Sequence, residues 1–222
     1  MNFKEYRTII FDCDGVILNS NNVKTESFRR AFSSYIEDLV EEFIAYHKSN
    51  GGISRYEKIK FFLEKLAPKY NYDNETINYH KILKKYSSIC IKALYDAEVE
   101  KNLKNLRDYN IKSKWLVISG GDQSELRDVF NFKKIYDYID GGIFGSPDKK
   151  IDILNREIEN KNIRNPALFI GDSKLDYQVA NSHLIKFIFI SQWTDFKEYK
   201  KFCKDNNICH VKNISSLYDL DL

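Results

Sequence analysis

Four short polar stretches stand out because each follows an apolar run of the kind that forms a buried strand. They supply carboxylates, a hydroxyl beside two glycines, and a pair of lysines. In chain order they are FDCDG with Asp12 and Asp14, VISGG with Ser119, Gly120 and Gly121, SPDKK with Lys149 and Lys150, and GDSKLD with Asp172 and Asp176. Because the carboxyl ends of parallel strands face one crevice, we expect these four stretches to meet at a single site.

The pair Asp12 and Asp14 is the hardest of these features to explain as ordinary structure. Two carboxylates one residue apart at the end of an apolar run repel each other unless a cation neutralises them. Mg²⁺ prefers oxygen ligands, and three aspartates would supply them. Phosphoryl transfer uses such a set, because one carboxylate can attack phosphorus while a second moves the proton. The Ser119 hydroxyl and the glycine N–H groups can hold the phosphoryl oxygens, and a lysine adds positive charge.

The elements that must position these groups are predicted to form a parallel α/β sheet in residues 1–17 and 98–222. Six β-rich runs alternate with helical patterns, and the runs are continuously apolar, as strands buried on both faces are. The runs are RTIIFD, KWLVIS, GGIFGS, ALFIGD, KFIFIS and NICHV. The four polar stretches follow the first four of these runs.

Residues 18–97 follow a different pattern. They contain no strand-like run, and their apolar residues recur at helical spacing. Ser54 and Glu57 form a capping box at the start of one helix, and we expect Pro68 to end it. This insert begins at the carboxyl end of the first strand, so we expect a helical domain that covers the site as a lid.

The composition narrows the class of protein. The chain has 222 residues, of which 43% are hydrophobic, and a net charge of +3, which is too weak and dispersed to indicate nucleic-acid binding. No apolar run approaches the roughly 20 residues of a membrane span, and the N-terminal run meets an aspartate too soon for a signal peptide. None of the four cysteines lies in a CxxC pair, which predicts free thiols and a cytoplasmic protein. The sequence carries no signal for an oligomeric state.

The four stretches, in this order, resemble the four motifs of the haloacid dehalogenase superfamily. The helical insert after the first motif is similar to the C1 cap of the β-phosphoglucomutase and phosphoglycolate phosphatase group. The resemblance spans essentially the whole chain and implies a Rossmann-like catalytic core, in residues 1–17 and 98–222, with a helical cap in residues 18–97. It also implies an enzyme that acts on a small phosphorylated molecule.

The resemblance assigns roles to individual residues. Asp12 is the expected nucleophile, Asp14 the general acid and base, and Ser119 with Gly120 the phosphoryl-binding group. Lys150 is the expected active-site lysine, and Lys149 is the alternative. The resemblance implies a Mg²⁺ site formed by Asp12, the backbone carbonyl of Asp14, Asp172 and Asp176.

Two further residues are expected to contact the substrate. NGGISRYEK resembles the substrate loop of β-phosphoglucomutase caps, so Arg55 would pair a distal anion or sugar oxygens, although it could also belong only to the first turn of a helix. Lys24 takes the position at which that pattern has a histidine, and Asn19 replaces the usual aspartate before Ser20.

These departures favour a phosphatase over a mutase. The expected function is therefore Mg²⁺-dependent hydrolysis of a small sugar or polyol phosphate through an aspartyl-phosphate. Asp14 argues against a dehalogenase, because halide leaves without a proton. A sugar phosphomutase is the alternative, and a binding module that has lost turnover is a third reading.

Overall fold

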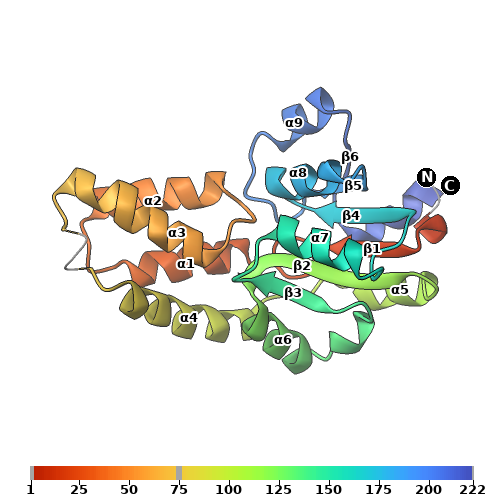
Figure 1. The fold of residues 1–222 in the computed structure, drawn as a ribbon, viewed down its shortest axis with the longest axis horizontal. Helices are drawn as coiled ribbons and strands as arrows, with labels where there is room; N and C mark the ends of the chain where they lie inside the picture. The colour runs from red at the N-terminus through yellow and green to blue at the C-terminus, as the bar shows by residue number, and fades with distance from the viewer. Residues whose placement is uncertain (1–2, 74–76, 222) are drawn as a thin grey trace.

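A computed structural model describes residues 3–73 and 77–221, and for residues 219–221 it describes the backbone only. The molecule has two parts, a six-stranded sheet covered by helices on both faces and a group of helices at one end of that sheet (Figure 1). None of the helices in the described ranges is both long and apolar enough to cross a membrane.

The sheet is parallel throughout, as the sequence predicts, and the structure shows its strand order to be β3-β2-β1-β4-β5-β6. β1 lies at its centre, where Phe11 is paired with Val117 on one side and Ile170 on the other. The strands are β1 (Thr8–Phe11), β2 (Lys114–Asp122), β3 (Ile143–Ser146), β4 (Ala167–Gly171), β5 (Lys186–Ile190) and β6 (Cys209–Val211).

Consecutive residues of the central strands enter two different cores, one on each face of the sheet. Ile9 and Phe11 pack in one core and Ile10 in the other, which explains why the strands read as continuous apolar runs. The first core is covered by α5 (Leu103–Tyr109) and α6 (Gln123–Phe132), and the second by α7 (Lys150–Glu159), α8 (Lys174–Ser182) and α9 (Tyr199–Asp205). Short 3₁₀ turns lie at η1 (Phe3–Glu5), η4 (Tyr136–Tyr138) and η5 (Ile214–Asp221).

The helical group is formed by the insert after β1. Its aromatic side chains pack on one another, with ring centroids 4.0 Å apart for Phe28 and Tyr86 and 4.1 Å apart for Phe32 and Phe62. Its helices are α1 (Asn21–Ala31), α2 (Glu37–Ser49), α3 (Arg55–Phe61) and α4 (Tyr79–Asp96). Stacked and edge-on rings of this kind stabilise a core beyond their burial alone.

The start of α3 agrees with the sequence in part, but its end does not. The Ser54 side chain accepts a hydrogen bond from the backbone N–H of Glu57, as a helix cap does. The second half of the predicted capping box does not form, because the Glu57 carboxylate lies 3.1 Å from Lys149 instead. The prediction that Pro68 ends this helix is wrong, because the helical path continues through a π-helical turn, η2 (Phe62–Leu66), and a 3₁₀ turn, η3 (Ala67–Tyr70). Pro68 lies in the first turn of η3, where its missing N–H leaves no bond unmade.

The two segments of chain that connect the sheet to the helical group lie side by side. Leu18 and Val99 form an antiparallel bridge, flanked by a 2.9 Å hydrogen bond from the Asn19 N–H to the Glu98 carbonyl. We propose residues 18–97 as the cap domain and residues 1–17 and 98–222 as the core, and this pairing of the connecting segments supports the division. We call the helical group the cap from here on.

The cap loop before α3 packs directly on the end of β2. A Cβ atom added at Gly120 would lie 2.1 Å from the carbonyl oxygen of Gly52, far inside van der Waals contact. Only a residue without a side chain therefore allows this approach of backbone to backbone.

We predict that Gly120→Ala displaces the cap loop and destabilises the protein by about 1–3 kcal/mol, which lowers Tm by several degrees. Thermal and urea unfolding measure the change. Gly51→Ala is the matched control, because its added Cβ meets only the Ser173 Cβ at 3.3 Å. Equal Tm values for the two variants would contradict the packing described here.

Candidate active site

Three buried carboxylates meet at the carboxyl ends of two neighbouring strands. Asp12 directly follows β1, Asp172 follows β4, and Asp176 lies in the first turn of α8. One oxygen of each lies within 4.8 Å of an oxygen of the others, and all three residues are buried. Such an all-oxygen set suits a hard divalent cation.

Hydrogen bonds hold two of these carboxylates in place. Asn21 Nδ2, at the start of α1, donates to Asp172 Oδ2 at 2.8 Å, so the cap orients a group of the core. Asp176 completes a capping box with Ser173, whose Oγ donates to Asp176 Oδ2 at 2.6 Å. Asp176 accepts a bond from Lys150 on its other oxygen, so Asp12 and Asp172 have more capacity for a metal.

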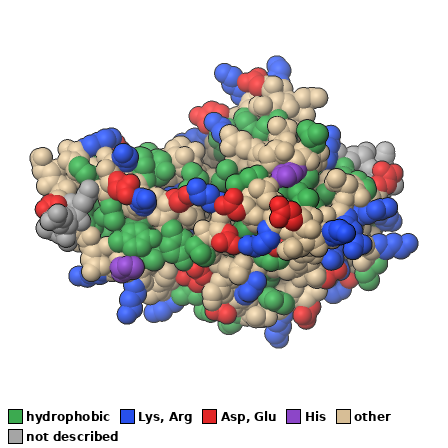
Figure 2. Space-filling view, viewed as in Figure 1, with side chains coloured by type: hydrophobic (Ala, Val, Ile, Leu, Met, Phe, Trp, Pro, Cys, Tyr) green, Lys and Arg blue, Asp and Glu red, His purple; other side chains and the backbone are tan. Residues whose placement is uncertain are grey.

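Lys150 provides the counter-charge within the core. Its Nζ lies 2.9 Å from Asp12 Oδ2 and 2.6 Å from Asp176 Oδ1, and its side chain is 1% exposed. Lys149, the alternative from the sequence, is exposed and lies 3.1 Å from Glu57 of the cap. The structure therefore brings Lys150 to the carboxylates and Lys149 to the junction with the cap, where acidic and basic side chains gather on the surface (Figure 2).

Burial makes negative charge costly in this cluster. Burial and the charges of Asp176 and Asp14 raise the pKa of Asp12 to about 7, although Lys150 acts in the opposite direction. Burial, Asp12 and Asp176 raise the pKa of Asp172 well above its ordinary value. Burial opposes the charge of Lys150, but the two carboxylates in contact with it raise its pKa. One lysine thus compensates the cluster only in part.

Asp14 lies in the turn after Asp12, with its carboxylate directed toward the cap. Ser20 Oγ donates to Asp14 Oδ1 at 2.6 Å, and Lys24 Nζ pairs with the other oxygen. Burial opposes ionisation of Asp14, but Lys24 and these hydrogen bonds lower its pKa. The turn requires glycine at Gly15, where φ is +75° and a Cβ would lie 2.1 Å from Asp172 Oδ2.

The Ser119 hydroxyl lies beneath the floor of the site. Ser119 is fully buried, its Oγ accepts a 3.1 Å hydrogen bond from the Gly121 N–H, and Gly120 and Gly121 line the cavity in its place. β2 continues past Ser119 to Asp122, which caps α6. The role predicted for Ser119 stays a prediction.

Arg55 forms the main ion pair between cap and core. Its two terminal nitrogens each lie 2.6 Å from an oxygen of Glu125 in α6, and Nη1 also donates to Ser87 at 2.8 Å. The guanidinium lies over the Tyr86 ring, 4.8 Å from its centroid. Arg55 lines the cavity, but its fork is engaged by a carboxylate, and its predicted contact with substrate stays a prediction.

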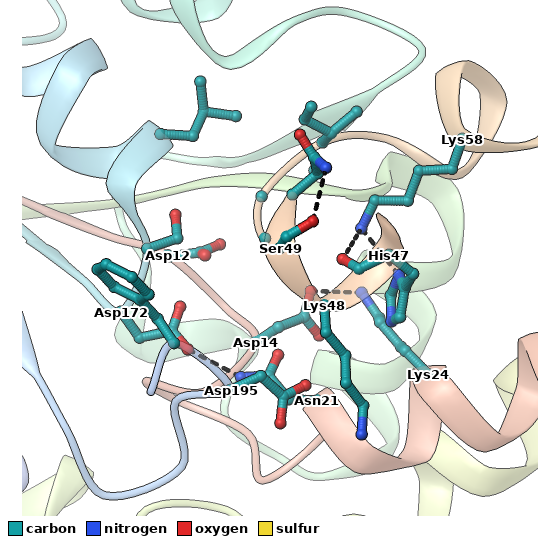
Figure 3. A pocket seen from close by; sticks show the side chains of 18 of the residues that line it. Asp12, Asp14, Asn21, Lys24, His47, Lys48, Ser49, Lys58, Asp172 and Asp195 are labelled. Atoms are coloured by element: carbon teal, nitrogen blue, oxygen red, sulfur yellow. Dashed lines mark hydrogen bonds and ion pairs between the residues drawn. The ribbon is translucent and has the colours of Figure 1, made fainter. Parts of the chain in front are cut away.

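The cavity between cap and core has a volume of about 250 Å³. Asp12, Asp14 and Asp172 lie on the core side, and Lys24, Lys58 and His47 on the cap side (Figure 3). The sequence analysis missed Asn21, His47, Lys58 and Asp195, which also line the cavity. Lys58 is the last residue of the NGGISRYEK stretch, in which the sequence points to Arg55 instead, and the other three lie outside the quoted motifs, so only proximity in space identifies the group.

The fold and this cluster define an α/β enzyme whose site lies between the sheet and a helical insert. The chain belongs to the haloacid dehalogenase-like hydrolase family, which it matches over residues 6–183. The comparison with curated proteins finds no match.

Three solved structures share the fold over nearly the full length of both chains. A predicted phosphatase from Clostridium acetobutylicum is 20% identical with a TM-score of 0.72, and covers 98% of this chain and 99% of its own. A haloacid dehalogenase-like family hydrolase from Streptococcus pneumoniae is 19% identical with a TM-score of 0.69, and covers 97% and 99%. The HAD-hydrolase YfnB from Bacillus subtilis, in a form bound to magnesium, is 16% identical with a TM-score of 0.68, and covers 98% and 99%. At these identities the likeness shows the fold alone.

We predict that Glu125→Gln lowers the free energy of unfolding by about 2 kcal/mol, because it leaves the buried Arg55 guanidinium without a counter-charge. Urea unfolding measures the loss, and a double-mutant cycle with Arg55→Met should give a coupling energy of about 1–3 kcal/mol. Glu64→Gln, which breaks only the exposed pair with Lys60, is the control, with a change below about 0.5 kcal/mol. A Glu125→Gln cost no larger than that of the control would show that cap and core are not joined by this pair.

Proposed function

We propose that the protein is a Mg²⁺-dependent phosphatase that hydrolyses a small sugar or polyol phosphate through an aspartyl-phosphate. The observation that carries the proposal is the buried Asp12 carboxylate, 2.9 Å from Lys150 and within one acidic cluster with Asp172 and Asp176, at the wall of a cavity. A carboxylate in this setting can act as a nucleophile toward phosphorus.

The residues present fit a resident divalent cation. Asp12, Asp172 and Asp176 offer only oxygen, they are buried, and a single lysine compensates their charge only in part. When bound, Mg²⁺ would neutralise charge on these carboxylates and on the phosphoryl oxygens. The magnesium bound to the Bacillus subtilis protein of the same fold supports this choice of ion.

The proposed reaction uses the side chains as follows. An oxygen of Asp12 attacks phosphorus, the bond from phosphorus to the ester oxygen breaks, and Asp14 donates a proton to that oxygen as the alcohol leaves. Asp14 then takes a proton from water, which attacks the aspartyl-phosphate, releases phosphate and restores Asp12. Lys150 holds Asp12 in position, and backbone N–H groups around Gly120 donate hydrogen bonds to the phosphoryl oxygens.

Lys24 controls the proton on Asp14 in this scheme. Asp14 is held as a carboxylate by Lys24 and Ser20. To act as an acid it must gain a proton, which requires the Lys24 ammonium to move away. The anionic phosphoryl group offers Lys24 that alternative partner, which supports its predicted contact with substrate.

Two further features support the size of the proposed substrate and the proposed cellular location. The cavity of about 250 Å³ suits a small metabolite. The free cysteines Cys13, Cys90, Cys203 and Cys209 support a reducing compartment and hence a cytoplasmic location. The grouping of nucleophile, acid and lysine argues against a binding module without turnover.

We predict that Asp12→Asn lowers kcat for release of phosphate from an aryl phosphate, with Mg²⁺ present, by roughly a thousandfold or more. Asparagine keeps the size of the side chain and removes its nucleophilic charge. The exposed Asp205→Asn is the control and should retain activity. Full activity in a folded Asp12→Asn variant would show that the nucleophile is another group. Conversion of a sugar 1-phosphate into its 6-phosphate without free phosphate would instead identify a mutase.

We predict that Mg²⁺ raises Tm, and more at about pH 8 than at about pH 5. The folded-state pKa of Asp12, about 7, exceeds its ordinary 3.8. In metal-free protein this group therefore stabilises the fold fully below pH 3.8, and that stability is lost as the pH rises toward 7. Mg²⁺ binds the ionised form, so its gain grows over the same range. At a hundred times Kd the gain is about 2.7 kcal/mol.

The matched variant for this measurement is Asp172→Asn. It removes one of the repelling charges, so at about pH 8 the metal-free variant should melt above the metal-free wild type, while its gain from Mg²⁺ should shrink. Unchanged Tm on adding Mg²⁺ or a chelator to the wild type at both pH values would rule out the proposed metal site.

A further inference from the structure

The cap side of the cavity carries more positive charge than its own carboxylates neutralise. Four cations line it: Lys24, Lys48, Arg55 and Lys58. Lys24 is paired with Asp14 and Arg55 with Glu125. Within residues 3–73 and 77–221, Lys48 and Lys58 form no ion pair with a carboxylate.

Lys58 is the more unusual of the two, because it is 3% exposed and is held by neutral groups. Its Nζ lies 2.9 Å from His47 Nδ1 and 3.3 Å from the His47 carbonyl oxygen. When Lys58 is an ammonium it only donates, so Nδ1 then accepts and the imidazole proton lies on Nε2, 3.1 Å from Thr25 Oγ1. This arrangement uses two of the three N–H groups of Lys58 and leaves the third uncommitted.

Burial of a cation among neutral partners is costly. Burial and the charge of Lys24 lower the pKa of Lys58 to about 7, and Asp14 and Asp195 oppose this without reaching ion-pair distance. Burial and the charges of Lys58 and Lys24 lower the pKa of His47 well below its ordinary value, so the imidazole is neutral. An anion at this position would remove the cost.

The location of Lys58 relative to the acidic cluster indicates which molecule brings that anion. Asp12 and Asp172 lie on one side of the cavity, and His47 and Lys58 lie on the opposite side, with Asp14 and Lys24 between them (Figure 3). A substrate whose phosphoryl group is attacked by Asp12 would extend its remaining atoms toward the cap. Lys48, on the same helix as His47, lines the same cavity with an exposed side chain.

We propose that Lys58, assisted by Lys48, binds a second anionic group of the substrate, so that the preferred substrates are small phosphate esters carrying a carboxylate or a second phosphate. This inference rests on the proposed function and narrows its substrate class to phosphorylated sugar acids or sugar bisphosphates. It also assigns the distal contact to Lys58, because the Arg55 fork is engaged by Glu125.

The test compares matched compounds that differ in the second charge. Glycerol 3-phosphate is paired with 3-phosphoglycerate, glucose 6-phosphate with 6-phosphogluconate, and fructose 6-phosphate with fructose 1,6-bisphosphate. The first two pairs report a carboxylate and the third a phosphate. Phosphate release with Mg²⁺ is measured for wild type, Lys58→Gln, Lys58→Met and the control Lys60→Met, an exposed lysine two residues away on the same helix.

In at least one pair, wild type should prefer the doubly anionic member in kcat/KM by about tenfold or more. Both Lys58 variants should lose most of that preference, mainly through KM, and Lys60→Met should retain it. No preference in any pair, or a preference that survives in a folded Lys58 variant, would overturn the proposal. If Asp195→Asn abolished the preference while the Lys58 variants kept it, the discrimination would depend on Asp195, and the proposal would be overturned.

A binding measurement separates failure of this inference from failure of the proposed function. In the Asp12→Asn background, the rise in Tm caused by each compound with Mg²⁺ reports binding without turnover. The doubly anionic compounds should give the larger rise, and adding Lys58→Gln should remove the difference. If the wild type hydrolyses none of the compounds but the difference in Tm is present, the phosphatase proposal is wrong and the anion site is retained. If the two members of every pair raise Tm equally, the anion site is wrong.

Discussion

The mutual repulsion of three buried carboxylates is the constraint on which the rest of the structure depends. Asp12 lies far in the chain from Asp172 and Asp176, and the parallel pairing of β1 with β4 brings the three carboxylates together with oxygens within 4.8 Å. One buried lysine, Lys150, contacts two of them and compensates part of the charge. The remaining charge supports the proposal that the site binds a cation and, through that cation, a phosphoryl group.

The cap supplies hydrogen-bonding and charged partners for side chains of the core. Asn21 donates a hydrogen bond to Asp172, Lys24 pairs with Asp14, and Arg55 joins α3 to α6 through Glu125. The approach of Gly52 to Gly120 sets how closely the cap can lie on β2. Its aromatic core is continuous with the core on one face of the sheet, so the cap is anchored to the sheet and holds Lys58 on the far side of the cavity. Charge thus changes sign across the site, from carboxylates on the core to lysines on the cap.

The sheet could be read from the sequence because its strands are short, apolar and separated by helical patterns. All six strand runs form strands, and the acidic stretches lie where parallel strands place their carboxyl ends. The choice between Lys149 and Lys150 required the structure, because the backbone conformation at the start of α7 decides which of two neighbouring side chains points into the site. The end of α3 was misjudged because a proline within a first turn removes no hydrogen bond.

The sequence by itself determined the architecture and which carboxylates meet at the ends of the strands, since both depend on local patterns and on residues adjacent in the chain. The tertiary structure alone decided the partners of the cap residues. Arg55 meets Glu125 70 positions away, and Lys58 meets His47 across two helices. Such contacts depend on how helices pack, and no local pattern encodes which buried cation receives a carboxylate and which is left for a ligand.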